Sequence, residues 1–402
     1  MMTGCTLRNR TDVVGGDRRA RSDDQLRCVS PLTPADDRTG QVRRKVRGSL
    51  LAGAAGDALG APVEFMTLDE IRRQHGPSGV TGFLPAYGRP GGAITDDTQM
   101  TLFTAEGMIR ALVRFSHRGI AHIPSVVQRA YWRWLITQGE AWPEGRFAPP
   151  GHGKDGWLTE VDRLRARRSP GNTCLSALRS GRVGTMSEPI NDSKGCGGVM
   201  RVAPIGFTTV ADPFRLATEC AALTHGHPSG YLPAGVLGSV IASLLAGEPL
   251  DAALDTATET LRAYDSHEET LAKLTAARAL AAGGRPTPEQ LESLGGGWVG
   301  EEALAIAVCC ALVADNVLDG LLLAVNHSGD TDSTGSITGN ILGTIHGEEA
   351  IPAHLLHDLE LRDVIARSAD DLTEAFHGEG VGSEYAPLDQ RVEGWLRRYP
   401  GH

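Results

Sequence analysis

The stretch Asp330-Thr331-Asp332-Ser333-Thr334-Gly335-Ser336-Ile337-Thr338-Gly339-Asn340-Ile341-Leu342-Gly343-Thr344-Ile345-His346 joins an acidic cluster to a segment with glycine at every fourth position. Its apolar residues recur at helical spacing, so the sequence predicts a helix over residues 333–347. Glycine lowers helix propensity, but a ridge of glycines lets a second backbone approach closely. Asn340 and the flanking acidic residues favour a soluble core over a membrane span. We therefore expect close helix packing in such a core.

A second acidic cluster, Thr95-Asp96-Asp97-Thr98, also precedes an apolar pattern at helical spacing. Thr95 or Asp96 is expected to cap that helix, where negative charge is favourable. Together the clusters offer four carboxylates and several hydroxyls, the ligand chemistry of a hard cation such as Mg²⁺ or Mn²⁺. If the two helix starts converge, a bound cation would relieve the repulsion between them. The alternative is that each aspartate only caps its own helix; with the motifs below, metal binding is preferred.

Composition limits the function classes. The chain has 402 residues, of which 41% are apolar and 22% charged, so it can bury a large core. A net charge of −10 argues against broad nucleic-acid or anionic-membrane binding and favours small molecules or a protein surface as partners. The seven cysteines show no C-x-x-C spacing, which indicates a reducing cytoplasm. We expect neither a signal peptide nor a membrane span, and we expect a monomer.

The chain divides into an arm and a domain. Residues 1–45 are rich in Arg and Asp and poor in large apolar residues, so they are predicted to be a disordered arm whose deletion costs little stability. Residues 46–402 are predicted to form one compact, all-α helical bundle, because alternating β-branched runs are essentially absent. Its expected helices cover 47–59, 97–116, 124–138, 172–180, 213–223, 231–246, 250–281, 301–318, 319–326 and 333–347. Residues 140–168 are expected to be a long loop, either a lid or a surface excursion.

Three glycine-rich segments accompany the acidic clusters. They are Gly56-Asp57-Ala58-Leu59-Gly60-Ala61-Pro62-Val63-Glu64-Phe65, Ser193-Lys194-Gly195-Cys196-Gly197-Gly198-Val199-Met200-Arg201 and Thr224-His225-Gly226-His227. Such segments can turn backbone amides toward phosphate oxygens, although neither a Walker loop nor a Rossmann fingerprint occurs. Asp57 is expected to be a structural acceptor, and Arg201 to form an internal ion pair.

In combination and order, these motifs resemble the ADP-ribosylglycohydrolase family over about residues 46–352. The resemblance implies an orthogonal all-helical bundle of that family's type, which binds two Mg²⁺ or Mn²⁺ ions and removes ADP-ribose from modified side chains. It implies one metal-ligand group at Thr95, Asp96 and Asp97, and a second at Asp330, Asp332 and Ser333. The Asp-Ser-Thr-Gly form of the second group is similar to the arginine-directed members.

The resemblance also implies substrate contacts. Glu64 matches a glutamate near the metals and the scissile ribose; we treat it as a candidate base or gate, with Asp96 or Asp97 as the rival base. The loop expected to wrap the diphosphate and neighbouring ribose contains Ser193, Gly195, Cys196, Gly197 and Gly198. His225 matches a histidine of that pocket, with Cys196 in place of an Asn seen in some eukaryotic members. Gly296, Gly297 and Trp298 match a loop that approaches the ligand.

The function expected from this resemblance is hydrolysis of the bond between ADP-ribose and a modified acceptor. The acceptor could be an ADP-ribosylated protein, with arginine preferred, or a small-molecule conjugate; an ADP-ribosylated nucleobase stays open. Two other classes also stay open: a non-catalytic ADP-ribose-binding protein, and a metal-dependent phosphohydrolase that cuts the diphosphate. Product analysis separates the three, because they give free ADP-ribose, no turnover and AMP, respectively.

Overall fold

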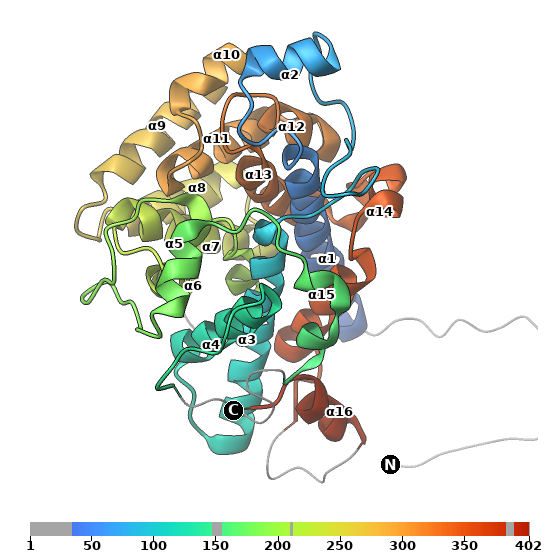
Figure 1. Cartoon of the computed structure of the whole chain (residues 1–402), viewed down its shortest axis with the longest axis vertical. Helices are drawn as coiled ribbons and strands as arrows, with labels where there is room; N and C mark the ends of the chain where they lie inside the picture. The colour runs from blue at the N-terminus through green and yellow to red at the C-terminus, as the bar shows by residue number, and fades with distance from the viewer. Residues whose placement is uncertain (1–33, 147–154, 210–211, 383–389, 402) are drawn as a thin grey trace, which may run out of the picture.

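The computed structural model describes residues 34–146, 155–209, 212–382 and 390–401 (Figure 1). These residues form helices and loops, and their β-structure is limited to two isolated bridges, so the predicted all-α class is confirmed. The α-helices are α1 (Pro34–Gly60), α2 (Leu68–His75), α3 (Asp96–Arg118), α4 (Ile123–Thr137), α5 (Asn172–Arg179), α6 (Pro213–Ala222), α7 (Pro228–Ala246), α8 (Leu250–Leu261), α9 (Glu268–Ala282), α10 (Pro288–Leu291), α11 (Gly300–Val313), α12 (Val317–Ala324), α13 (Thr331–His346), α14 (Ala353–Asp358), α15 (Arg362–His377) and α16 (Gln390–Arg398). Short 3-10 helices include η1 (Trp157–Glu160), η2 (Asp162–Arg165), η3 (Cys196–Gly198) and η6 (Glu348–Ala350).

The helix pair α1 and α13 lies at the centre of the molecule (Figure 1). The glycine ridge of α13 packs on a second set of glycines in α1. A Cβ placed on Gly339 would lie 2.1 Å from the carbonyl oxygen of Ala52, and one on Gly343 would lie 2.1 Å from that of Gly48. The two backbones are therefore in direct contact. The expected close packing is found, and its partner is the helix that carries Gly56 and Gly60.

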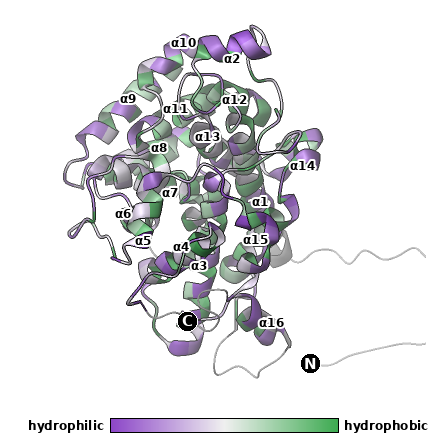
Figure 2. Ribbon diagram, in the orientation of Figure 1, coloured by the Kyte–Doolittle hydropathy of each residue, from purple (hydrophilic) through white to green (hydrophobic). Residues whose placement is uncertain are grey.

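The remaining helices pack around this pair. Figure 2 shows hydrophobic residues concentrated on the inner helices, while the outer α2, α9 and α10 carry many hydrophilic ones. Helix α7 is long and apolar enough to cross a membrane by length and composition, but 78% of it is buried inside the protein. It packs against α6 and α8. Its apolar character is thus explained by its place in the core.

One helix predicted from the sequence is two helices in the structure. The pattern over 250–281 predicts a single helix, whereas the structure has α8 and α9 joined by a turn. Ser266 in this turn has a φ of 58°, a left-handed conformation that ends a regular helix. The helical spacing continues through the turn because both helices bury one face. Helices α2, α10, α14, α15 and α16 were not predicted.

The predicted arm boundary is also wrong. Residues 1–33 lie outside the described residues, but α1 begins at Pro34, so residues 34–45 belong to the helical domain. The Thr39 hydroxyl donates to the carbonyl of His377 at 3.1 Å. Arg43 lies 3.7 Å from Asp370 and Arg44 lies 3.9 Å from Glu349, so these arginines are not a purely solvated tail. Their partners lie on α15 and η6, far along the sequence.

The sequence predicts that residues 140–168 form a long loop, either a lid or a surface excursion. Its residues 147–154 lie outside the described residues, while 155–168 pack on the body of the protein. Asp155 pairs with Arg110 at 2.8 Å and with Arg133 at 2.9 Å, and both arginine side chains are fully buried. Gln99 of α3 donates to the carbonyl of Ala166 at 2.9 Å. This part is a fixed wall beside the start of α3.

The helical contacts of residues 34–44 generate a stability prediction. A chain that lacks residues 1–44 should unfold at a lower temperature than a chain that lacks residues 1–33. The shorter chain loses the Thr39 hydrogen bond, the ion pairs of Arg43 and Arg44, and the part-buried Val42. Calorimetry of the two truncated chains measures the difference; equal unfolding temperatures would contradict the packing of α1 on α15.

The contact between α1 and α13 generates a second prediction. Gly339→Ala should lower the free energy of unfolding by about 3 kcal/mol or more, since a new methyl group would overlap a backbone carbonyl that cannot move away cheaply. Gly394→Ala is the matched control, because Gly394 is a helical glycine with open space around it. The control should be neutral or stabilising. Urea unfolding of both variants measures the effect, and equal behaviour would contradict the proposed contact.

Candidate active site

The starts of α3 and α13 converge on one cavity. Asp96 and Asp97 from α3, and Asp330, Asp332 and Ser333 from the start of α13, line a space of about 380 Å³ together with Glu64. All five residues from the helix starts are at least 95% buried. The convergence expected from the sequence is therefore found. Thr95 lies behind these residues and does not line the cavity.

The start of α3 is held by α1. Both carboxylate oxygens of Asp57 accept the backbone amide of Thr95 at 3.0 Å, and one accepts the amide of Thr98 at 3.1 Å. The Thr98 hydroxyl also donates to Asp57. The Thr95 hydroxyl caps the helix by accepting the amide of Asp97 at 3.3 Å. Asp57 is thus the structural acceptor that was expected. It fixes the position of the start of α3, which carries Asp96 and Asp97.

The start of α13 is held from two sides. The Thr331 hydroxyl donates to the carbonyl of Gly60 at 2.9 Å, at the end of α1. The backbone amide of Asp330 donates to the carbonyl of Gly296 at 2.8 Å. One carboxylate oxygen of Asp330 accepts the amide of Ser333 at 3.3 Å, and the other accepts the thiol of Cys196 at 2.8 Å. The acidic cluster is therefore anchored to both α1 and the two glycine-rich loops.

The electrostatics of the cavity are those of crowded, buried carboxyl groups. Burial raises the pKa values of Asp96 and Asp97, and the surrounding aspartates raise them further. Burial likewise raises the pKa values of Asp330 and Asp332. The pKa of Glu64 is raised first by burial and then by the charges of Asp332 and Asp330. A positive charge in the cavity would allow these groups to ionise together.

The residues of the cavity fit a hard cation. The Asp97 Oδ1 and Glu64 Oε2 atoms are buried and have no hydrogen-bond partner among the described residues. The Ser333 hydroxyl donates toward the sulfur atoms of Cys196 and Met200, at 3.6 and 3.9 Å, and a hydroxyl that donates keeps its oxygen lone pairs. Among the described residues, however, no three acidic, His or Cys side chains already surround a common point as metal ligands. The donor set is suitable, and ligation would require small side-chain movements.

The loop that contains Ser193 and Cys196 forms another wall. Gly195, Cys196 and Gly197 line the cavity, whereas Ser193 and Gly198 do not. The Ser193 hydroxyl instead accepts the amide of Gly195 at 3.2 Å and so shapes the loop. Gly198 packs on α7, where a Cβ would lie 2.4 Å from the carbonyl oxygen of Gly230. The cavity therefore meets only the middle of this loop.

His225 lines the same cavity as a neutral ring. Burial lowers its pKa to about 3, and the charge of Arg201 adds to this effect. Arg201 donates to the Thr224 hydroxyl oxygen at 2.7 Å, and that oxygen lies 2.9 Å from His225 Nδ1 and 3.5 Å from the Ala221 carbonyl oxygen. When the hydroxyl donates to Nδ1, the ring proton lies on Nε2. A Cβ on Gly195 would lie only 3.2 Å from Nε2, so this nitrogen faces the loop.

The prediction that Arg201 forms an internal ion pair is wrong. The side chain is fully buried, and its guanidinium group lies 4.2 Å from the centre of the Tyr131 ring. It contacts the hydroxyl of Thr224, the carbonyl of Cys220 and two sulfur atoms. An aromatic face and neutral acceptors take the place of a carboxylate.

Two further parts of the cavity wall were not predicted from the sequence. Phe65 is 69% exposed and stacks on Trp298, with ring centres 5.2 Å apart. Residues 169–174 form a second edge, and the amide of Gly171 donates to Asp96 at 3.3 Å. The Ser-Pro-Gly sequence immediately before α5 is a turn signal that could have indicated this edge. The stacking of Phe65 could not be inferred, because it depends on a φ of 70° at that residue.

Comparison with known proteins gives concordant results. The ADP-ribosylglycohydrolase family model matches residues 38–382. The chain is 25% identical to the ADP-ribosyl-[dinitrogen reductase] glycohydrolase of Rhodospirillum rubrum over 328 residues, which cover 80% of this chain and 92% of that protein. It is 26% identical to an ADP-ribosylarginine hydrolase of Serratia proteamaculans, over 82% of this chain and 78% of that protein.

The fold also matches a solved structure described as an ADP-ribosylglycohydrolase-related protein complex. The TM-score is 0.57 at 23% identity, and the match covers 83% of this chain and 99% of that chain. At this identity the match supports the fold. Together with the family match over most of the sequence, it identifies the chain as a hydrolase of the ADP-ribosylglycohydrolase family.

Proposed function

We propose that this protein hydrolyses the glycosidic bond between ADP-ribose and a modified protein arginine, and that it needs two Mg²⁺ or Mn²⁺ ions to do so. The observation that carries the proposal is the meeting of two acidic helix starts with Glu64 in one cavity. A purely structural role gives little reason to bury several carboxyl groups around a shared space, because each must be desolvated beside the others. Bound cations would offset that cost.

The metal ligands in this proposal come from the two helix starts. Asp96, Asp97, Asp330 and Asp332 would supply carboxylate oxygens, with Ser333 as a hydroxyl ligand. Thr95, which is expected as a ligand from the sequence but does not line the cavity, would instead position Asp96 and Asp97 by capping α3. When bound, the cations would orient the ribose hydroxyls and acidify a nearby water molecule. Breaking the bond at the anomeric carbon creates a centre with oxocarbenium character, which the surrounding carboxylates stabilise.

The protein's own groups would position the substrate and move the proton. His225 presents Nε2 of a neutral ring toward the loop at Gly195, and with the ring proton on Nε2 it would donate to a phosphate or hydroxyl oxygen of the substrate. Glu64 enters the cavity from the end of α1 and is the proposed base for the attacking water, with Asp96 or Asp97 as its rival.

An arginine acceptor is supported by the cavity wall. Phe65 and Trp298 offer exposed aromatic faces there, and guanidinium groups stack on such faces. The relative from Serratia is named for ADP-ribosylarginine, which supports the same choice.

Product analysis tests the proposal directly. The protein is incubated with an ADP-ribosylarginine protein and Mg²⁺ or Mn²⁺, and free ADP-ribose and unmodified arginine are expected. EDTA should abolish the activity, and either cation should restore it. Adding metal to the metal-free protein should also raise its unfolding temperature, because the native state binds metal more strongly than the unfolded chain. Release of AMP, or no turnover with any ADP-ribosylated acceptor, would contradict the proposal.

Paired substitutions separate chemistry from metal binding. Glu64→Gln should keep the metal-induced rise in unfolding temperature and the binding of ADP-ribose, but lower kcat at least about a hundredfold. Asp332→Asn should lose both turnover and the metal-induced rise, since it removes a charge from the ligand set. Equal kcat values in Glu64→Gln and the parent would exclude Glu64 from the chemical step. The role of the base would then pass to Asp96 or Asp97.

A further inference from the structure

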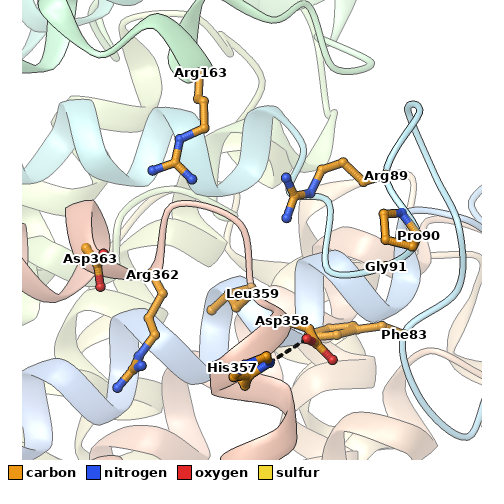
Figure 3. Close-up of a pocket in the computed structure, with 10 residues that line it drawn as sticks. All are labelled: Phe83, Arg89, Pro90, Gly91, Arg163, His357, Asp358, Leu359, Arg362 and Asp363. Atoms are coloured by element: carbon orange, nitrogen blue, oxygen red, sulfur yellow. Dashed lines mark hydrogen bonds and ion pairs between the residues drawn. The ribbon is translucent and has the colours of Figure 1, made fainter.

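A second cleft lies apart from the carboxylate cavity, on the side of the molecule formed by α14 and the start of α15 (Figure 3). Its volume is about 520 Å³, within the range of small-molecule sites. None of its lining residues is shared with the carboxylate cavity. The cleft carries three arginines from distant parts of the chain: Arg89, Arg163 and Arg362.

Two of these arginines have no hydrogen-bond or ion-pair partner among the described residues. Arg163 and Arg362 are exposed, and neither makes a hydrogen bond or an ion pair within the described part of the chain. Figure 3 shows Arg163 and Arg89 facing the space above Leu359, whereas Arg362 leaves the start of α15 and extends away in this view. An exposed side chain without partners can turn into the cleft at little cost. Three guanidinium groups can thus reach one ligand.

The walls that hold these arginines are fixed. Arg89 sits in a tight turn in which its amide donates to the carbonyl of Ala86 at 2.9 Å and its carbonyl accepts the Ala86 amide at 3.2 Å. The following chain is pressed against the end of α14, because a Cβ on Gly92 would lie 2.3 Å from the carbonyl oxygen of Asp358. Arg163 is carried by η2, whose Leu164 is fully buried. The arginines therefore project from a preformed site.

The charge of the cleft favours an anion. Two aspartates also line it, Asp358, which is hydrogen-bonded to His357 at 2.7 Å, and Asp363 in the first turn of α15, so the three arginines leave one net positive charge. The start of α15 adds positive potential, since that 16-residue helix has no side-chain cap. Arg89 is only loosely engaged: its Nε lies 3.9 Å from Glu360 and has no hydrogen bond. Guanidinium groups in such an arrangement match the paired oxygens of phosphate groups.

We propose that this cleft is a second ligand site, separate from the carboxylate cavity, which binds the diphosphate group of a small molecule. Arg89 and Arg163 grip the diphosphate from facing walls, and Arg362 closes over it. Volume remains for a nucleoside attached to that group. The site goes beyond the proposed hydrolase function and does not depend on it.

Chemical protection of individual arginines tests the proposal. The full-length protein is treated with phenylglyoxal in metal-free buffer, with inorganic pyrophosphate or ADP as the probe and chloride at equal ionic strength as the reference. Mass spectrometry measures modification at each arginine. At ten times Kd, either probe should slow modification of Arg163 and Arg362 by about tenfold. Arg118 and Arg397 are exposed internal controls without hydrogen bonds or ion pairs in the described chain, and should not be protected.

A binding measurement gives an independent result. The double variant Arg163→Gln/Arg362→Gln should raise the Kd for pyrophosphate at this site at least about tenfold, because two charged hydrogen-bonding groups are lost. Arg118→Gln/Arg397→Gln loses the same charge and should bind like the parent. Tighter binding of ADP than of pyrophosphate would indicate that the nucleoside also contacts the cleft, and equal binding that the diphosphate alone is recognised. Equal protection of all four arginines, or an unchanged Kd in the first variant, would overturn the proposal.

Discussion

The direct backbone contact between α1 and α13 is the constraint on which the rest of the structure depends. Glycines on both helices allow the carbonyl groups of one to lie where side chains of the other would normally stand. This contact places Asp57, near the end of α1, beside the start of α3, and it places Gly60 beside Thr331. Both acidic helix starts are therefore positioned by the same helix. The glycines lower helix propensity at several positions, and they allow the two acidic helix starts to meet.

Crowding of carboxyl groups works against this arrangement. Burial and mutual repulsion favour the protonated forms, whereas the helix starts and the backbone amides around them favour charge. The polar network around the cavity holds the carboxyl groups in position. Asp57 accepts from Thr95 and Thr98, and Cys196 donates its thiol to Asp330. The geometry of the site is therefore set by its supporting residues.

The sequence predicted the all-α class, because helical periodicity and helix caps are local signals. The meeting of the acidic clusters with Glu64, Cys196 and His225 in one pocket was implied by a family resemblance that motif order carries. The sequence did not predict the partner of the glycine ridge or the role of residues 34–45, since both depend on contacts with distant helices. The stacking of Phe65 on Trp298 and the arginine cleft were missed for the same reason: their residues are scattered, and only the tertiary fold brings them together.

The link between Thr331 and Gly60 spans 271 positions of the sequence. During synthesis on the ribosome, α1 therefore emerges long before α13. The glycine-rich face of α1 cannot be covered by α13 during that time. The two acidic helix starts cannot come together before α13 has been synthesised. A nascent chain that ends before α13 should thus be unable to attack ADP-ribosylated molecules.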